Sequence, residues 1–318
     1  MFKDKSVLVA GGSGLIGIQL VDLLIQRGAK VNVVDLRKPY GKVNFPDVVT
    51  FKKMDLTDYT NCISACGDMD YVFNLMCIKG SPKAMKERPA SHLVPMLMFN
   101  TNLMEAAREC KVQRYLYTSS VGVYYPTDVL IEDDVWKTFP SEHDWYAGWT
   151  KRIGELQAQA YQIQYGWNEI SIVRPTNTYG PYDDFDSDGA TAVPSLIRKF
   201  LSGKSPVVIW GDGSNIRDFM YSEDVARGMM LVMEKSPGPN YPVNLGSGKR
   251  YSIKDLVNVI LSNIDEKPEL IWDTSEVTGD SVRVMDVSRA RSLGFEQTIS
   301  LEEGIRKTID WYRNEKKN

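Results

Sequence analysis

The sequence is poor in histidine, and this scarcity limits the chemistry that the chain can perform. His92 and His143 are the only two histidines among 318 residues. Two histidines are too few for a metal site built from several imidazoles, and they give little basis for a serine–histidine relay. We therefore expect no metal site, and any reaction must rely on other side chains or on a bound cofactor.

A strong charge of one sign is also lacking. The chain carries 38 basic and 41 acidic residues, a net charge of −3, without the basic excess of nucleic-acid binders. Long apolar runs are missing too, since residues 7–10 are followed by glycines and no later run approaches the roughly 20 residues of a spanning helix. The four cysteines form no zinc-type pairs, so we expect reduced thiols. The sequence predicts a cytoplasmic protein that binds neither nucleic acid nor a membrane.

What the first half does contain is an alternation of short apolar runs and amphipathic stretches. This pattern is typical of a parallel sheet with helices on both faces. It predicts an α/β protein with a doubly wound parallel sheet of the Rossmann type. The expected strands are 7–10, 31–34, 48–51, 71–75, 115–118 and 169–173, and the expected helices are 15–27, 57–66, 95–110 and 149–165.

The composition changes near residue 176, where glycine, proline, aspartate and tyrosine gather. Beyond this point helices are expected at 193–203, 222–234 and 300–315, with strands at 207–210 and 242–245, and the stretch 252–264 belongs to the same C-terminal part. We predict a first domain over 1–175, to which 215–245 return, and a smaller α/β lobe over 176–318. A cleft between the two is the expected place for a ligand.

A glycine-rich turn follows the first expected strand and opens the first expected helix. Its glycines are Gly11, Gly14 and Gly17. Glycines at this spacing allow a tight turn, a close backbone approach to a pyrophosphate, and close packing of the helix on the sheet. The first helical residues, Leu15 and Ile16, would add N–H donors at the positive end of the helix dipole. The turn therefore predicts a dinucleotide site in the domain 1–175.

The end of the second expected strand indicates which dinucleotide binds. Asp35 lies there, 18 residues after Gly17. A carboxylate at this point accepts hydrogen bonds from both ribose hydroxyls and repels a 2′-phosphate, which favours NAD over NADP. Arg37 is the one feature that favours NADP, but a solvated surface charge is the preferred explanation for it. We predict NAD as the cofactor.

Together these motifs resemble the extended short-chain dehydrogenase/reductase family, in its NAD-dependent nucleotide-sugar epimerase/dehydratase branch. The pattern is most similar to that of GDP-fucose synthase relatives, and the resemblance covers nearly the whole chain. It implies an NAD-binding first domain and a substrate-binding second lobe. Beside the glycine turn, the residues that it assigns to the cofactor are Asp55 and Leu56 at the adenine, Lys79 near the phosphates, and Leu75, Asn100, Lys151 and Pro175.

The resemblance also implies a catalytic serine, tyrosine and lysine. Ser120, just after the fifth expected strand, corresponds to the serine that holds the substrate oxygen, and Lys151 corresponds to the lysine. In the family the ammonium lowers the tyrosine pKa, and the phenolate removes a proton from a sugar hydroxyl. The family spacing is Tyr-x-x-x-Lys, but Tyr146 lies five residues before Lys151, and Ala147 holds the usual position.

Two interpretations of this spacing stay open. Gly148 would allow a bulge or a late helix start that returns Tyr146 to the site. Otherwise Tyr146 is a packing residue, and the proton moves through Ser120, another group or water.

The second half resembles the segments of the family that contact the substrate. Asn177, Arg217 and Arg283 correspond to residues that bind the diphosphate of a nucleotide-sugar, a task that suits arginine because its rigid fork bonds to phosphate oxygens. The blocks around Asn177 and residues 286–305 are most similar to those of GDP-fucose synthase relatives, so we expect a GDP-sugar.

Departures from the family patterns narrow the expected reaction. Val121 and Gly122 follow Ser120, where the dehydratases carry Asp and Glu, and Gly122 and Tyr182 stand where GDP-fucose synthase carries a cysteine and a histidine. Hydride transfer at sugar C4 remains, by a 4-epimerase or a C4 dehydrogenase. The alternative is a non-catalytic protein that senses NAD or nucleotide on the same fold. Helices 95–110 and 149–165 resemble those that pair in family dimers, so we expect a homodimer.

Overall fold

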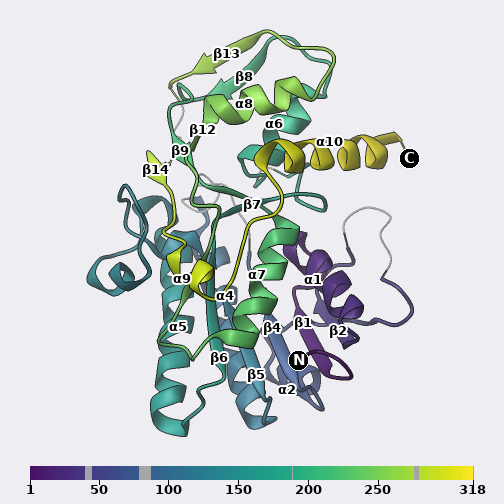
Figure 1. Cartoon of the computed structure of the whole chain (residues 1–318), viewed down its shortest axis with the longest axis vertical. Helices are drawn as coiled ribbons and strands as arrows, with labels where there is room; N and C mark the ends of the chain where they lie inside the picture. Colours follow the sequence, from purple (N-terminus) through teal and green to yellow (C-terminus); the bar gives the residue numbers. More distant parts are fainter. Residues whose placement is uncertain (40–44, 79–86, 188, 276–278, 318) are drawn as a thin grey trace.

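The central feature of the protein is a sheet of seven parallel strands, seen in a computed structural model that describes residues 1–39, 45–78, 87–187, 189–275 and 279–317 (Figure 1). The strand order is β11-β6-β5-β4-β1-β2-β3. The strands are β1 (Ser6–Ala10), β2 (Lys30–Asp35), β3 (Thr50–Lys53), β4 (Tyr71–Asn74), β5 (Arg114–Thr118), β6 (Ile170–Pro175) and β11 (Val243–Leu245). The predicted doubly wound sheet is confirmed.

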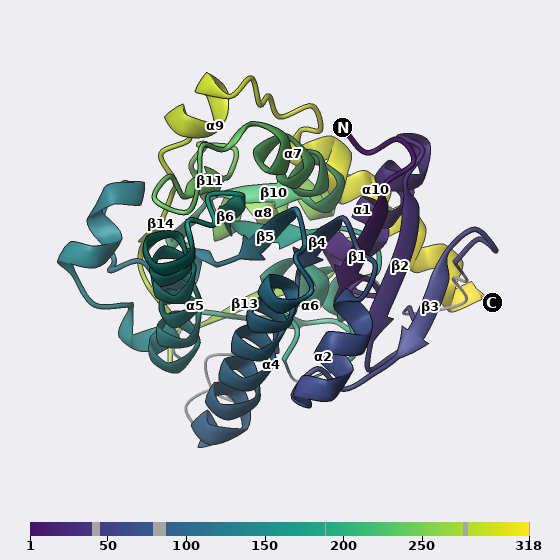
Figure 2. The same cartoon turned by 90° about the horizontal axis from the view of Figure 1, so that it is seen from below.

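Helices cover both faces of this sheet (Figure 2). One face carries α1 (Leu15–Gln26) and α7 (Ser222–Lys235), and the other carries α2 (Tyr59–Cys66), α4 (Pro89–Glu109) and α5 (Trp145–Tyr165). Every residue of β4 and of β6 is buried. Burial on two faces explains why these strands are continuous apolar runs in the sequence.

Two helices begin earlier than their sequence pattern predicted. α4 begins at Pro89 rather than at 95, because the fixed φ of proline suits a first helical turn, where its missing N–H costs nothing. α5 begins at Trp145 rather than at 149, because a 3₁₀ turn over Glu142–Asp144 leads directly into it. The predicted strand 48–51 is displaced by two residues, to Thr50–Lys53.

Beyond the main sheet, the chain forms short paired strands around a second apolar core (Figure 1). The pairs are β7 (Asn177–Tyr179) with β10 (Phe219–Tyr221), β8 (Val207–Trp210) with β13 (Leu270–Asp273), and β9 (Ile216–Arg217) with both β12 (Tyr251–Ser252) and β14 (Val282–Arg283). The helices of this part are α6 (Ala192–Phe200), α8 (Ile253–Ser262), α9 (Ser288–Ser292) and α10 (Leu301–Lys317). By contrast, α7 packs on α1 and β11 pairs with β6.

The strand order creates one place where a ligand site is expected. The chain proceeds from β1 outward to β2 and β3 on one side, and β4, β5 and β6 follow on the other. In such sheets ligands bind outside the carboxyl ends of the strands at this reversal. Within the described ranges, no helix is long and apolar enough to cross a bilayer, and no group of three or more His, Cys, Asp or Glu side chains is placed to hold a metal ion.

Candidate active site

The glycine turn after β1 connects the sheet to the start of α1. Gly11 has φ +79°, and its N–H donates to the carbonyl of Val34 at 2.9 Å. A side chain at Gly17 would meet the Gly11 oxygen at 2.5 Å, so the helix packs too closely on the turn for any other residue. At Gly14 the nearest atom to an added Cβ is 3.4 Å away. The Ser13 hydroxyl is buried in this turn, without a hydrogen-bond partner among the described residues.

The first residues of α1 and the end of β2 face this turn. Leu15 and Ile16 open the helix, and the N–H groups of a first turn have no intrahelical partner. The carboxylate of Asp35 accepts hydrogen bonds from the backbone N–H groups of Ser13 and Arg37, both at 3.2 Å. An open glycine turn, unpaired N–H groups and an adjacent carboxylate fit the pyrophosphate and ribose of a dinucleotide.

A buried amide pair shapes the chain after β4. The N–H of Leu75 donates to Ala10 of β1 at 2.9 Å. Asn100, buried on α4, accepts a hydrogen bond from the Asn74 side chain at 2.9 Å. Asn74 in turn accepts from the N–H of Met76 at 3.0 Å. Asn100 therefore sets the path of the segment beside the predicted cofactor position.

The other predicted cofactor residues have more varied surroundings. Asp55 accepts two hydrogen bonds from Thr57. The Leu56 side chain is buried in the core, so any contact with a ligand at this position would come from its backbone. Pro175 is the last residue of β6. Lys79 lies outside the described residues.

Lys151 is a buried cation at the carboxyl ends of two strands. Its Nζ donates to the carbonyl of Thr118, the last residue of β5, at 2.8 Å, and to the carbonyl of Met76, after β4, at 3.0 Å. Burial lowers the pKa of Lys151. The residue after Met76 is Cys77, which is exposed. Lys151 of α5 thus reaches the edge where the family resemblance places the reaction.

Ser120 lies at the same edge, two residues beyond β5. It is partly exposed, and its Oγ accepts a hydrogen bond from the N–H of Gly122 at 3.1 Å. Gly122 belongs to a 3₁₀ turn over Val121–Val123. A side chain at Gly148 would meet the Gly122 oxygen at 2.4 Å, so the first turn of α5 is seated directly on the turn that holds Ser120.

The structure does not bring Tyr146 to Lys151, and the expected late helix start is wrong. α5 is a continuous helix from Trp145, and residues five apart on an α-helix point about 140° away from each other. Tyr146 is 40% exposed, whereas Lys151 is buried. Gly148 serves close packing on residues 122 and 140 rather than a bulge. Ala147, four residues before Lys151, occupies the face that the family tyrosine would occupy.

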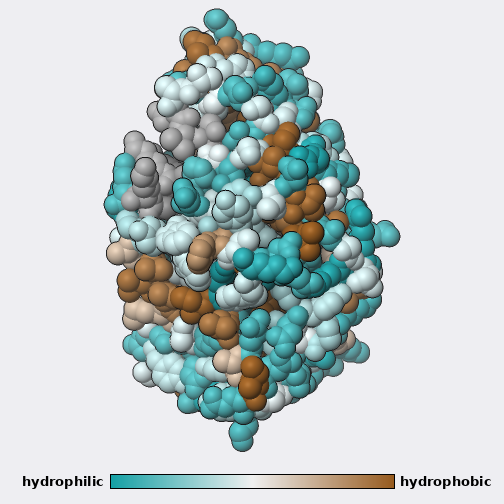
Figure 3. Space-filling view, turned by 90° about the vertical axis from the view of Figure 1, so that its left-hand side faces the viewer, coloured by the Kyte–Doolittle hydropathy of each residue, from teal (hydrophilic) through white to brown (hydrophobic). Residues whose placement is uncertain are grey.

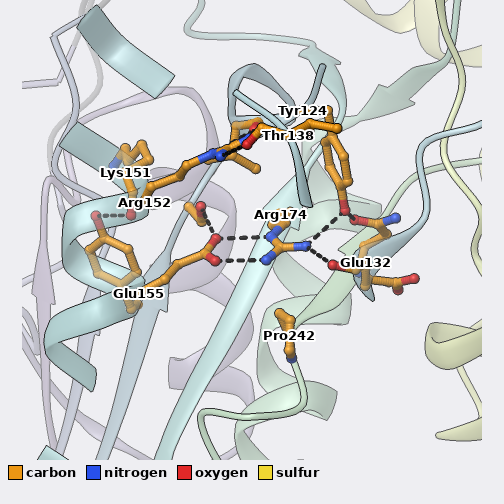
Figure 4. A network of polar contacts seen from close by, with 12 residues as sticks. Tyr124, Glu132, Thr138, Lys151, Arg152, Glu155, Arg174 and Pro242 are labelled. Carbon is orange, nitrogen blue, oxygen red and sulfur yellow. Dashed lines mark hydrogen bonds and ion pairs between the residues drawn. The ribbon is translucent and has the colours of Figure 1, made fainter. Parts of the chain in front are cut away.

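A network of buried polar side chains, which the sequence did not predict, connects α5 to strand β6 of the sheet (Figure 4). Arg174 of β6 donates to both carboxylate oxygens of Glu155, at 2.8 and 2.6 Å. Ser119 also donates to Glu155, at 2.5 Å, while Arg174 donates to the hydroxyl of Tyr124 and to the carbonyl of Glu132. The signal that could have revealed it is an arginine at the end of an apolar strand.

The predicted diphosphate residues lie on the short strands beyond the sheet. Arg217 of β9 and Arg283 of β14 are direct neighbours in parallel register. Nη2 of Arg283 is 2.5 Å from a carboxylate oxygen of Asp144 and 2.5 Å from one of Asp280. Burial alone would lower the pKa of Arg283, but these carboxylates raise it. Burial, and then the neighbouring Arg283, lower the pKa of Arg217 to about 10.

Asn177, the third predicted diphosphate residue, begins β7 and is partly exposed. Its side-chain amide donates to the carbonyl of Asp218 at 3.0 Å. Asp218, the residue after Arg217, thus accepts the hydrogen bond of Asn177. The predicted diphosphate-binding segments around Asn177 and Arg217 are therefore in contact.

Comparison with known proteins agrees with this geometry. Residues 7–246 match the family described as "NAD dependent epimerase/dehydratase family". The chain is 30% identical to GDP-L-fucose synthase 1 of Arabidopsis thaliana over 323 residues, which cover 98% of this chain and 94% of that protein.

Solved structures give the same result. UDP-N-acetylglucosamine 4-epimerase from Methanobrevibacter ruminantium superposes with a TM-score of 0.87 at 28% identity, covering 98% of this chain and 99% of that one. UDP-glucose 4-epimerase of Thermus thermophilus, solved with NAD, gives 0.84 at 26% identity, covering 97% and 99%. The predicted resemblance and the predicted cofactor, NAD, are confirmed. The chain belongs to the NAD dependent epimerase/dehydratase family.

Proposed function

We propose that the protein is an enzyme that uses NAD to oxidise a nucleotide-sugar at C4, as a 4-epimerase or a C4 dehydrogenase. One observation carries the proposal: a chain of contacts joins the arginine pair to the catalytic edge. Arg283 holds Asp144, Asp144 packs on Gly122, and Gly122 bonds to Ser120. A sugar whose diphosphate lies at the arginines would extend toward Ser120 and Lys151.

The residues at this edge have distinct tasks in the proposal. The glycine turn and Asp35 would hold NAD, which when bound would supply a hydride acceptor for the sugar carbon; an epimerase would return this hydride to the sugar, and a dehydrogenase would release it as NADH. Ser120 Oγ would hold the sugar hydroxyl by a hydrogen bond, and the proton of that hydroxyl would pass to water at this partly exposed edge, because no tyrosine lies within one helical turn of Lys151 on its face of α5. The Lys151 ammonium would stabilise the negative charge that develops on oxygen.

The nucleotide is proposed by similarity. The resemblance to GDP-fucose synthase relatives, and the 30% identity to one of them, support a GDP-sugar. The solved epimerases named above act on UDP-sugars by their names, so both nucleotides belong in the test.

The test is incubation of the purified protein and NAD with GDP-hexoses and UDP-hexoses, followed by NMR of the sugars and absorbance of NADH. An epimer without net NADH supports a 4-epimerase. A keto sugar with equal NADH supports a dehydrogenase. Binding of NAD without turnover of any sugar would contradict the enzymatic proposal.

That last outcome would favour a second candidate, a non-catalytic protein that senses NAD or nucleotide. The observation in its favour is the absence of a tyrosine on the Lys151 face of α5. Against it stands Lys151 itself, since a buried ammonium between two strand ends costs stability that a sensing role does not require.

We also propose a homodimer formed through α4 and α5. A stripe of exposed apolar residues follows both helices and consists of Val94, Met98, Ile153, Leu156 and Ile163. Figure 3 shows hydrophobic residues in a band across this side of the molecule. Contiguous exposed apolar surface of this kind marks a protein contact.

A further inference from the structure

Arg283, one of the two arginines that would bind the diphosphate, is already paired with two carboxylates. Asp144 and Asp280 both lie 2.5 Å from Nη2 of Arg283, and all three side chains are less than a fifth exposed. Arg217 lies beside Arg283 in register. The single positive charge of Arg283 thus lies between two carboxylates, so an added diphosphate would have to compete with these two negative groups for Arg283.

The two carboxylates are not held equally. Asp280 also accepts a hydrogen bond from Ser141 Oγ at 2.7 Å and from Nε of Arg283 at 2.8 Å. Among the described residues, Asp144 makes no such additional side-chain hydrogen bond. Asp144 is the N-cap residue of α5, but its carboxylate does not cap the helix. Of the two, Asp144 is therefore the one that can leave Arg283 without breaking other bonds.

The surroundings of Asp144 also keep it close when it leaves. Its Cβ lies 3.2 Å from the point where a Cβ on Gly122 would be, so the glycine provides the room that the Asp144 side chain uses. The next residue, Trp145, begins α5, whose Gly148 packs on Gly122. The carboxylate is thus tethered beside Arg283 at a high effective concentration.

We propose that Asp144 is an internal competitor for Arg283, which the diphosphate of the substrate displaces and which returns to help the product leave. The inference rests on the proposed function. It makes Asp144 a positioning residue that acts through Arg283. Its role is to keep the affinity for the nucleotide low enough for turnover.

Asp144→Asn tests the proposal by removing the competing charge while keeping the shape. Titration calorimetry with GDP and with UDP should show a Kd about tenfold lower than that of the wild-type protein, because one negative charge near the diphosphate is lost. Steady-state KM and kcat should fall together, since product held more tightly leaves more slowly. Damage to the fold would instead weaken binding.

Two further variants serve as controls, and a third repeats the test. Glu142→Gln removes an exposed carboxylate two residues away and should change Kd by no more than about twofold. Asp144→Glu keeps the charge and should restore a Kd near that of the wild-type protein. Asp144→Ala, which also removes no helix cap, should tighten binding as Asp144→Asn does.

The outcomes separate this inference from the proposed function. If the wild-type protein binds GDP or UDP and Asp144→Asn binds it no more tightly, the competitor role is wrong and the proposed function stands. If neither nucleotide binds to the wild-type protein or to the variants, both proposals are wrong.

Discussion

Lys151 is the residue on which the proposed chemistry depends most. Its ammonium is buried and donates to two backbone carbonyls rather than to a carboxylate. Such a cation is costly to bury, and its position at the ends of β4 and β5 leaves its charge available to a ligand there. Tyr146, by contrast, lies on the exposed side of the same helix.

These two positions give opposite predictions for substitution. Lys151→Met should lower kcat at least about 100-fold, since the charge that stabilises the oxygen is lost. Tyr146→Phe should keep kcat within about twofold of wild type, because its hydroxyl does not reach Lys151. Steady-state assays on the sugar identified as substrate, with melting curves for each variant, are the measurement. A large loss of turnover in Tyr146→Phe would contradict this prediction and show that the Tyr146 hydroxyl takes part in the reaction.

The sequence located Ser120 and Lys151 through family spacing but could not place Tyr146. Spacing fixes which side chains share a helix face only when the start of the helix is known. The early start of α5 depends on Gly148 fitting against Gly122, a contact between residues far apart in the chain. The pairing of Arg283 with Asp144 was equally hidden, because Asp144 precedes it by 139 residues.

A fully buried ion pair joins α5 to β6 in the main domain. Glu155 and Arg174 are both buried and form two hydrogen bonds with each other. Replacing both residues of a buried ion pair with well-packed apolar residues can leave the stability unchanged. Removing only one partner leaves the other charge buried without compensation.

Glu155→Gln should therefore lower the free energy of unfolding by about 3–5 kcal/mol. Urea unfolding followed by circular dichroism measures this change. The matched control is Glu303→Gln, whose partner Lys307 lies at 3.2 Å with both side chains about 40% exposed, and which should change stability by less than about 1 kcal/mol. Equal effects of the two substitutions would show that the buried pair has no special role.

Long elements were predicted from the sequence, but most strands of two or three residues were not. The inner strands and the long helices have enough residues to show an apolar period. β7, β9, β10, β12 and β14 have two or three residues each, and a pattern that short has no period. Their positions follow from pairing with distant partners, so only the fold reveals that Arg217 and Arg283 are neighbours.

At the scale of the whole molecule, the proposed homodimer depends on the apolar stripe on α4 and α5. Leu156, 53% exposed, lies near its middle. A buried charge at this point would disrupt a symmetric contact twice, once in each subunit. The continuous apolar strands in the sequence predicted the layered sheet. The proposed dimer surface could not be predicted in this way, because its residues lie on two helices whose relative positions only the fold shows.

Leu156→Lys should therefore give a particle of about half the mass of the wild-type protein in light scattering. Ile271→Lys is the control, because Ile271 is 44% exposed on β13, away from the stripe, and should leave the mass unchanged. A wild-type protein that already has the mass of one chain would contradict the dimer.

The four cysteines, all within the described residues, differ in their exposure and therefore in how readily their thiols react. Cys62 and Cys66 are buried, and burial raises the pKa of both thiols, that of Cys62 to about 12. Cys77 alone is exposed, directly after the carbonyl that accepts the Lys151 hydrogen bond. Thiol-directed dyes react through the thiolate at accessible sites. Cys110 is partly exposed, and burial raises the pKa of its thiol, so a fluorophore should attach first at Cys77, where its emission would follow the arrival and departure of ligands.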